Sequence, residues 1–527
     1  MKTSALHQRS LQPNGKTPLV TTASFVTALS IAERGLGFLY RVVLSRLLGA
    51  EGLGLYQVAL SLFAVFLTLG TGGIPVTVSR FISKSKAAHT PWEEKGATSA
   101  GVALSLLLTL PFVLLFLFFP NISSPLFSDE RGVPVFRILM LGLCFSSVYA
   151  VFRGSFWGNK RFLLPSVLEI AEESVMVLVG VLLLRNVSSP LQGAKLAAWA
   201  VVLSYLFSFT ASFLAFLICG GRFSRPKKQL KPLFNATLPI TSVRVGSSLI
   251  SSAVAVLLPI MLVRAGASES EAITLFGIVS GMAMPVLFIP STIIGSLALV
   301  LVPQLSEDYY AHRTQRLHQN LARGLTVAFL VACFLAPFFY AVGNQLGTLA
   351  FSQPLAGEVI CKGSPILLPM SLAMISTSML NSMGYERQTF FFYFIGAAAM
   401  LLCILFLPPV CGAYAYVIGL TVNFILNAVC NLWFLHKKCP NLFKTMATTQ
   451  RGAGLRAAVK GGVCVLPLSL LGGLFYALFS RFCGVLLSVF FTSLSLFFAT
   501  AVLWCLLGVL PVNQWKTRKK QAKRPVF

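Results

Sequence analysis

The sequence predicts an all-α polytopic membrane protein of about fourteen transmembrane helices, built as two pseudo-repeated six-helix lobes followed by two C-terminal helices. The chain of 527 residues is 56% hydrophobic and only 11% charged, with a mean hydropathy of +0.81, whereas soluble domains carry about 25% charged residues. Apolar stretches of about 20 residues, enough to cross a bilayer, recur along the whole chain. The basic residues gather in alternate gaps between these stretches, as they do in multispan membrane proteins.

Charges, prolines or glycine clusters bound each of the fourteen predicted spans. In chain order the spans cover residues 19–44, 54–79, 97–119, 135–157, 163–185, 196–219, 234–262, 273–302, 323–342, 363–383, 389–408, 413–435, 457–479 and 483–510. The first is expected to be a retained helix, because no small-residue cleavage site follows a short apolar core.

The domain organisation follows from the longest basic gaps, which come after the sixth and twelfth spans. They predict a cytoplasmic tail (1–18), an N-terminal six-helix lobe (19–232) and a C-terminal six-helix lobe (233–456). A final helix pair (457–510) and a basic tail (511–527) follow. The second span of each lobe has a similar sequence with a Gly/Pro break. Many secondary transporters consist of two such halves around a central site.

The distribution of Lys and Arg predicts the orientation in the membrane. Both tails and the even-numbered gaps carry 30 of the 42 basic residues, and the opposite gaps carry 7. The positive-inside rule then places both termini in the cytoplasm. Because this charge is explained by topology, we do not expect nucleic-acid binding.

Nothing in the sequence indicates an enzyme, a metal centre or a bound cofactor. The eleven cysteines are scattered without a CxxC pair, and no histidine lies within a predicted span. No Gly-x4-Gly-Lys-Ser/Thr sequence occurs, so ATP is not expected to drive the chain directly. We therefore predict no catalytic residues and no metal ligands.

Arginines within the spans are the first candidate site residues. Arg34 and Arg41 are seven residues apart in the first span, so they share one helix face about 10 Å apart along the axis. Arg244 opens the second lobe in the same way. A charge at membrane depth costs about 2.5 kcal/mol or more and is read as functional by default. Such a charged helix face is expected to point into a helix bundle or a water-filled cavity. A cavity lined by arginines favours the binding of an anion.

A second charged constellation lies in the fourth and fifth spans. Glu169, Glu172 and Glu173 follow i, i+3, i+4 spacing and form one acidic helix face. They could carry a proton or a monovalent cation, or they could neutralise Arg34 or Arg153. Arg153 itself could instead lie at the membrane interface beside Trp157.

Helix breakers gather in the second and eighth spans, and in most cases a single breaker is a harmless kink. Their crowding favours helices that bend and line a moving cavity. The predicted bending positions are Gly72, Gly73, Pro75, Pro285 and Pro290.

The run Arg34–Tyr56, RGLGFLYRVVLSRLLGAEGLGLY, closely resembles the opening of the stage V sporulation protein B group. Thr71–Pro75, Arg153-Gly154, Ser280–Pro285 and Phe288–Ser291 also match. These proteins are polysaccharide-transporter relatives within the multidrug/oligosaccharidyl-lipid/polysaccharide flippase superfamily, and they are related to the MurJ-type lipid II flippases. The resemblance covers the first twelve spans.

The resemblance implies a flippase of the bacterial plasma membrane that works by alternating access. Its substrate would be an undecaprenyl-diphosphate-linked sugar, used for peptidoglycan, spore-cortex or polysaccharide synthesis. Anion binding would carry over to Arg34, Arg41 and Arg80, and we expect Arg244 to join them from the second lobe while Glu173 takes part in resetting. Membrane potential, H⁺ or Na⁺ would drive transport, with membrane lipids and cell-wall synthesis proteins as partners.

The chain departs from the family pattern in the eighth span, which contains no arginine, and at Ser251–Ala255 in the seventh. These departures leave the identity of the headgroup open. Two other functions are also kept open. A cation-coupled multidrug exporter of the same superfamily is favoured by the acidic face. A non-transporting scaffold for wall synthesis would act through the basic loops.

Overall fold

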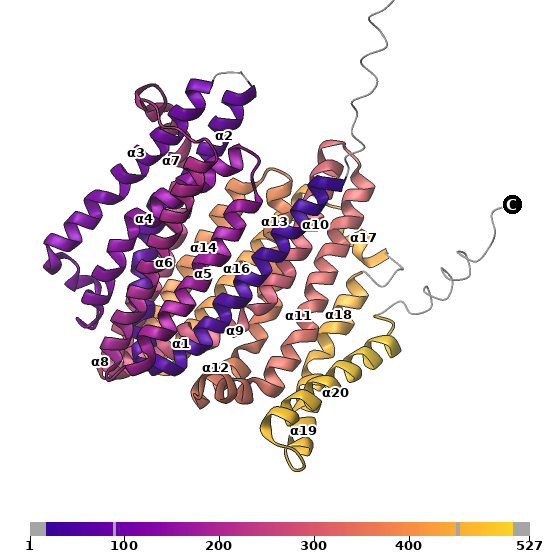
Figure 1. Ribbon diagram of the computed structural model, residues 1–527. Coiled ribbons are helices and arrows are strands. Elements are labelled where there is room, and N and C mark those ends of the chain that lie inside the picture. Colours follow the sequence, from indigo (N-terminus) through magenta and orange to yellow (C-terminus); the bar gives the residue numbers. More distant parts are fainter. Residues whose placement is uncertain (1–16, 88–90, 449–453, 510–527) are drawn as a thin grey trace, which may run out of the picture. The chain divides into compact units, whose positions relative to one another are not determined.

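The computed structural model describes residues 17–87, 91–448 and 454–509, and all the regular structure in them is helical. The chain divides into two compact units, Met1–Ser252 (unit 1) and Ala253–Phe527 (unit 2). Figure 1 shows long helices throughout. The division falls inside α7 instead of in the basic gap before it, so Arg244 belongs to unit 1 and not to the second lobe as expected.

Unit 1 consists of the first seven α-helices, and α7 continues into unit 2. Their bounds are α1 Thr17–Thr71, α2 Ile74–Ala87, α3 Pro91–Phe118, α4 Gly132–Gly158, α5 Leu163–Leu183, α6 Pro190–Ile218 and α7 Lys227–Arg264, with short 3₁₀ turns at Pro120–Ile122, Ser124–Leu126 and Leu184–Asn186.

Helix α1 is a hairpin of two helical limbs. Gly49 interrupts it with φ 69° and ψ 178°, a conformation that glycine adopts without a Cβ clash. Glu33 and Thr71 line the same pocket, although 38 residues of unbroken helix would separate them by about 57 Å. The limbs 17–48 and 50–71 therefore run back along each other, as expected of the first two spans.

Unit 2 contains the remaining helices. Their bounds are α8 Glu269–Phe276, the π-helix η4 Gly277–Ala283, α9 Met284–Leu287, α10 Ile289–Tyr310, α11 Thr314–Phe351, α12 Pro354–Gly363, the 3₁₀ turn η5 Ser364–Ile366, α13 Leu367–Ser382, α14 Glu386–Phe406, α15 Pro408–Cys411, α16 Tyr414–Lys438, α17 Leu442–Thr448, α18 Leu455–Val463, α19 Val465–Phe479 and α20 Val485–Leu506.

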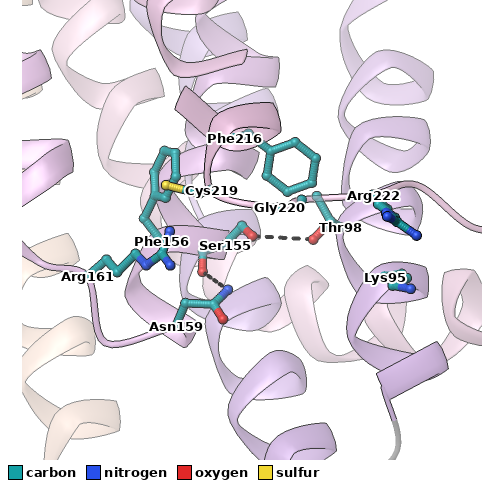
Figure 2. A pocket seen from close by; sticks show the side chains of 11 residues that line it. Lys95, Thr98, Ser155, Phe156, Asn159, Arg161, Phe216, Cys219, Gly220 and Arg222 are labelled. Carbon is teal, nitrogen blue, oxygen red and sulfur yellow. Dashed lines mark hydrogen bonds between the residues drawn. The ribbon is translucent and has the colours of Figure 1, made fainter. Parts of the chain in front are cut away.

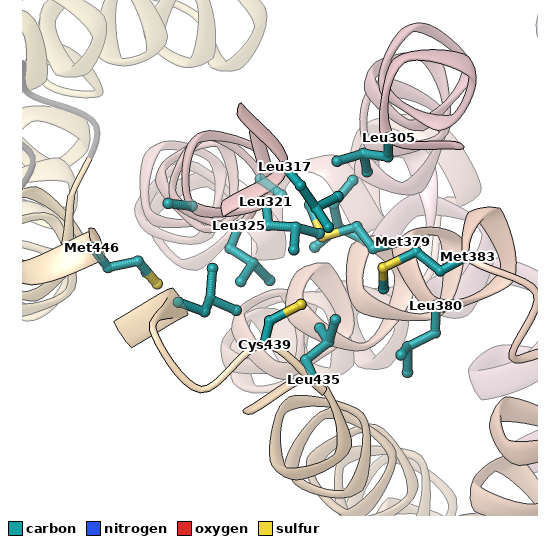
Figure 3. Close-up of a cluster of buried hydrophobic side chains, with 14 of the residues drawn as sticks. Leu305, Leu317, Leu321, Leu325, Met379, Leu380, Met383, Leu435, Cys439 and Met446 are labelled. Carbon is teal, nitrogen blue, oxygen red and sulfur yellow. The ribbon is translucent and has the colours of Figure 1, made fainter. Parts of the chain in front are cut away.

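The core of unit 2 forms around α11. Figure 3 shows Leu321 and Leu325 of α11 facing Met379 of α13, with Leu435 of α16 beside them. The yellow helices α18 to α20 in Figure 1 pack on another part of α11 through a second buried cluster that includes Cys333. The last two predicted spans thus share unit 2 with the second set of six.

The helices are interrupted at the positions where the sequence concentrates breakers. Gly72 and Gly73 separate α1 from α2, and Pro75 lies in the first turn of α2. In unit 2, the Met284 N–H bonds to the Val279 carbonyl, five residues back, just before Pro285. Proline lacks an N–H, and a π-helical turn is one way to accommodate that loss. Pro290 lies in the first turn of α10, after a turn at Phe288. Movement at these positions stays a prediction.

Thirteen stretches of the described residues are long and apolar enough to cross a membrane. The sequence predicts fourteen spans, and the two numbers differ for three reasons. The first two predicted spans form one continuous stretch from α1 through α2, and the eighth is divided into two stretches within α8 to α10. The fifth, helix α5, does not meet the criterion. Helix α5 has 21 residues but carries three glutamates. The prediction of an all-α multispan membrane protein is confirmed.

We expect Gly154→Ala to destabilise unit 1. A Cβ at Gly154 in α4 would lie 2.5 Å from the Pro75 carbonyl oxygen and 2.7 Å from the Pro75 Cα, so backbone atoms would have to move. Overpacking of this kind costs about 1–3 kcal/mol. Thermal unfolding of the purified protein in detergent measures the effect.

Gly295→Ala in α10 is the matched control, because nothing lies within 4 Å of a Cβ there. Alanine has the better helix propensity by up to about 1 kcal/mol, so this variant should be as stable as the parent or more so. Equal melting temperatures for the Gly154 and Gly295 variants would contradict the close contact between α4 and α2.

Candidate functional site

A polar pocket of about 210 Å³ lies inside unit 1, between α1, α4, α5 and α6. Four carboxylates line it, from Glu33 on α1 and from Glu169, Glu172 and Glu173 on α5. Among the described residues on its wall, Arg153 of α4 is the one cation. We refer to this cavity as the acidic pocket.

Arg153 is held in the acidic pocket by several contacts. Its guanidinium donates to Glu169 Oε1 at 2.9 Å, and the two side chains are 27% and 22% exposed. Its Cζ lies 5.9 Å from the ring centroid of Tyr149 and 5.3 Å from that of Trp157, within the range of cation–π attraction. The ion pair that the sequence left open is therefore formed with Glu169.

The other carboxylates of the acidic pocket are not paired in this way. Glu172 Oε2 is buried and has no hydrogen-bond partner among the described residues. Glu173 comes so close to α1 that a Cβ at Gly37 would lie 2.9 Å from its Oε1. The described lining of the acidic pocket thus holds four carboxylates and one guanidinium, while Arg34 and Arg41 act on Glu33 and Glu173 from outside that lining.

The predicted anion-binding arginines lie outside the acidic pocket. Arg34 and Arg41 of α1, Arg80 of α2 and Arg244 of α7 all have exposed side chains. None of the four is ion-paired within the described part of the chain, where the salt bridges that occur involve Arg131, Arg153, Arg313 and Lys362. Salt bridges among the described residues therefore do not neutralise these arginines, but Arg34 lies within electrostatic range of Glu33, and Arg41 within that of Glu173.

Arg34 and Arg244 lie at a similar level of unit 1. Glu33, next to Arg34, lines the same pocket as Thr71. The following residue, Gly72, approaches Arg244, because a Cβ there would lie 3.5 Å from the Arg244 Cδ. Thr68 lies one helical turn before Gly72, and Ser248 lies one helical turn after Arg244. Their hydroxyl groups share a hydrogen bond of 2.8 Å. The break after α1 thus packs against the part of α7 that carries Arg244.

Sequence reasoning missed Glu33, Tyr149 and Tyr205 as parts of the acidic pocket. Glu33 stands in the run that drew attention to Arg34, so its charge within a span was a usable signal. The two tyrosines gave none, because tyrosine is common in apolar helices. Only the packing of α4 and α6 brings them to the pocket.

Known proteins resemble this chain in sequence. A family model described as "Polysaccharide biosynthesis protein" matches residues 19–308. Stage V sporulation protein B of Bacillus subtilis (strain 168) is 24% identical over 421 residues, which cover 76% of this chain and 81% of the relative. Lipid II flippase MurJ of the same organism is 22% identical over 404 residues, which cover 70% and 73%.

Solved structures share the fold. The inward closed conformation of lipid II flippase MurJ matches with a TM-score of 0.69 and 12% identity, over 92% of this chain and 99% of that one. An inward-facing multidrug resistance MATE family transporter of the MOP superfamily matches with a TM-score of 0.65 and 15% identity, over 78% and 96%. The predicted resemblance is confirmed. The chain belongs to the polysaccharide biosynthesis protein family and has the fold of the multidrug/oligosaccharidyl-lipid/polysaccharide flippase superfamily of membrane transporters.

Proposed function

We propose that this protein is a flippase that moves a lipid-diphosphate-linked oligosaccharide or peptidoglycan precursor from the inner to the outer leaflet by alternating access. It would serve cell-wall, spore-cortex or polysaccharide biosynthesis in the bacterial plasma membrane, with both termini cytoplasmic. The observation that supports the proposal is a set of exposed arginines on membrane helices of unit 1 that form no salt bridge among the described residues: Arg34, Arg41, Arg80 and Arg244.

The chemistry of guanidinium supports a diphosphate as the ligand. Its planar fork matches phosphate oxygens with two parallel hydrogen bonds, and it stays charged in a poorly hydrated setting. Arg34 and Arg244 come from different helices at a similar level of unit 1, and we propose that both contact one headgroup. Arg41 follows Arg34 two turns further along the same face.

The ion pair between Arg153 and Glu169 in the acidic pocket supports assigning substrate binding to the other arginines. Arg153 is engaged by Glu169 and by two aromatic rings. It therefore neutralises part of the local acid charge and is not free to bind substrate. The remaining carboxylates point to a role in ion coupling, which we assign to Glu172 and Glu173.

The names of the similar proteins agree with this substrate class. One relative is a lipid II flippase and another is a stage V sporulation protein. We carry their general role, handling of a lipid-linked wall precursor, to this chain as part of the proposal.

A cation-coupled multidrug exporter is the second candidate, and the four carboxylates of the acidic pocket favour it. Cationic drugs need acidic groups, and a MATE family transporter shares the fold. The exposed arginines count against this candidate, because they would repel a cationic drug.

Replacing either Arg34 or Arg244 by Ala should lower flipping at least tenfold. Hydrogen bonds to a charged group are worth about 1.5–3 kcal/mol, and 1.4 kcal/mol corresponds to a factor of ten. The assay is transfer of a labelled undecaprenyl-diphosphate-linked sugar across proteoliposome membranes. Arg264→Ala removes an exposed charge from the end of the same helix α7 and serves as the control. Unchanged flipping by the Arg34 and Arg244 variants, at normal membrane abundance, would refute the assignment.

An imposed potential should change the rate in a defined direction. A diphosphate carries about two negative charges, and each gains about 2.3 kcal/mol per 100 mV when it leaves a negative interior. Outward flipping in the same vesicles should therefore speed up with the inside negative and slow down with the inside positive. Equal rates under both polarities would argue against net outward movement of negative charge.

Glu172→Gln and Glu173→Gln separate the two candidate functions. For a flippase with an ion site in the acidic pocket, these variants should lose the response of flipping to Na⁺ and pH gradients and still bind the lipid diphosphate. Glu386→Gln, an exposed glutamate at the start of α14, is the control. Export of cationic drugs by the parent, abolished in the pocket variants, would instead establish the exporter.

A further inference from the structure

A second polar cavity of unit 1 has none of the arginines and carboxylates discussed above on its described lining. It measures about 160 Å³ and lies between the start of α3, the end of α4 and the end of α6. Figure 2 shows Lys95, Arg161 and Arg222 around it, with Thr98, Ser155 and Asn159 between them. We refer to this cavity as the basic pocket.

Two helix C-termini build the basic pocket with the same backbone motif. At the end of α4, the Arg161 N–H bonds to the Phe156 carbonyl at 2.9 Å, and Lys160 takes a left-handed φ of 59°. At the end of α6, the Gly221 N–H bonds to the Phe216 carbonyl at 2.8 Å, after Gly220 at φ 80°. These six-to-one bonds define Schellman caps. The caps turn the chain so that Arg161 and Arg222 reach the cavity.

The basic pocket carries three cations and no carboxylate on its described lining. Arg161 and Arg222 are exposed, and neither takes part in the salt bridges found among the described residues. A helix C-terminus attracts cations through its dipole, which accounts for these two arginines. The third cation, Lys95, comes from near the start of α3.

Uncharged donors complete the basic pocket. Ser155 is buried, and the Thr98 hydroxyl donates to its Oγ at 3.5 Å, as the dashed line in Figure 2 shows. The Asn159 amide donates to the Ser155 carbonyl at 2.8 Å. Hydroxyl groups beside guanidinium and ammonium groups are the donors that phosphate oxygens accept from.

We propose that the basic pocket binds a phosphate group. About 160 Å³ corresponds to about five water molecules, which is room for the five heavy atoms of one phosphate. All three cations come from gaps that are predicted to be cytoplasmic. The phosphate therefore comes either from an anionic lipid headgroup of the inner leaflet or from a soluble phosphate compound. Basic pockets between transmembrane helices on the cytoplasmic side bind anionic headgroups in other membrane proteins.

Cys219 provides a direct probe, because it lines the basic pocket and is exposed. The experiment measures the rate of maleimide labelling at Cys219 in the full-length protein, with Cys505, also exposed, read in the same sample by peptide mass spectrometry. One arm adds inorganic phosphate. The other compares phosphatidylcholine nanodiscs with and without phosphatidylglycerol.

A bound phosphate should slow labelling of Cys219 at least threefold and leave Cys505 unchanged. Slowing by inorganic phosphate identifies a soluble source, and slowing only by phosphatidylglycerol identifies a lipid source. Unchanged labelling of Cys219 in both arms overturns the proposal. This reading needs no variant, so it does not depend on whether a pocket variant folds.

Variants then test whether the basic residues cause the protection. Arg161→Gln combined with Arg222→Gln should abolish it. The matched control, Arg316→Gln combined with Arg323→Gln, removes two exposed arginines from α11 and should keep it. Equal protection in both double variants overturns the proposal. The result is independent of flipping, because none of these residues belongs to the proposed substrate site.

Discussion

Placement of charge within an apolar chain is the constraint on which the rest of this structure depends. A charged side chain in a membrane helix has to meet a partner, water or a ligand, since hydrocarbon cannot solvate it. Unit 1 meets this constraint in two ways. Glu169 and Arg153 pair at 2.9 Å inside the acidic pocket, whereas Arg34 and Arg244 remain exposed and outside the salt bridges described for the chain. The separation of salt-bridged from exposed charge is the basis on which we propose an anion site in this unit.

The backbone obeys the same constraint where the helices break. Interrupted helices leave N–H and carbonyl groups that must find partners. At the break after α1, the Gly72 N–H still bonds to the Thr68 carbonyl at 2.7 Å, and the Thr68 hydroxyl reaches Ser248. In unit 2 the π-helix before Pro285 keeps the Met284 N–H bonded. The interruptions therefore cost few hydrogen bonds in either unit.

Much of the fold could be predicted because hydropathy and loop charge are strong one-dimensional signals. The hairpin at Gly49, the break at Gly72 and the acidic face on α5 lie where the sequence puts them. Contacts between helices distant in sequence could not be predicted. Nothing local indicates that Glu33 meets α5, or that Arg244 packs with unit 1 beside Gly72. The basic pocket was missed for the same reason, because its three cations come from three separate gaps.

The most direct test of the central claim is a structure of the protein determined with an undecaprenyl-diphosphate-linked sugar bound. The account predicts that the diphosphate lies within about 2.7–2.9 Å of the guanidinium nitrogens of Arg34 and Arg244. Glu169 should keep its bond to Arg153. A diphosphate bound elsewhere, with Arg34 turned to pair with Glu33 or Glu173, would contradict the account.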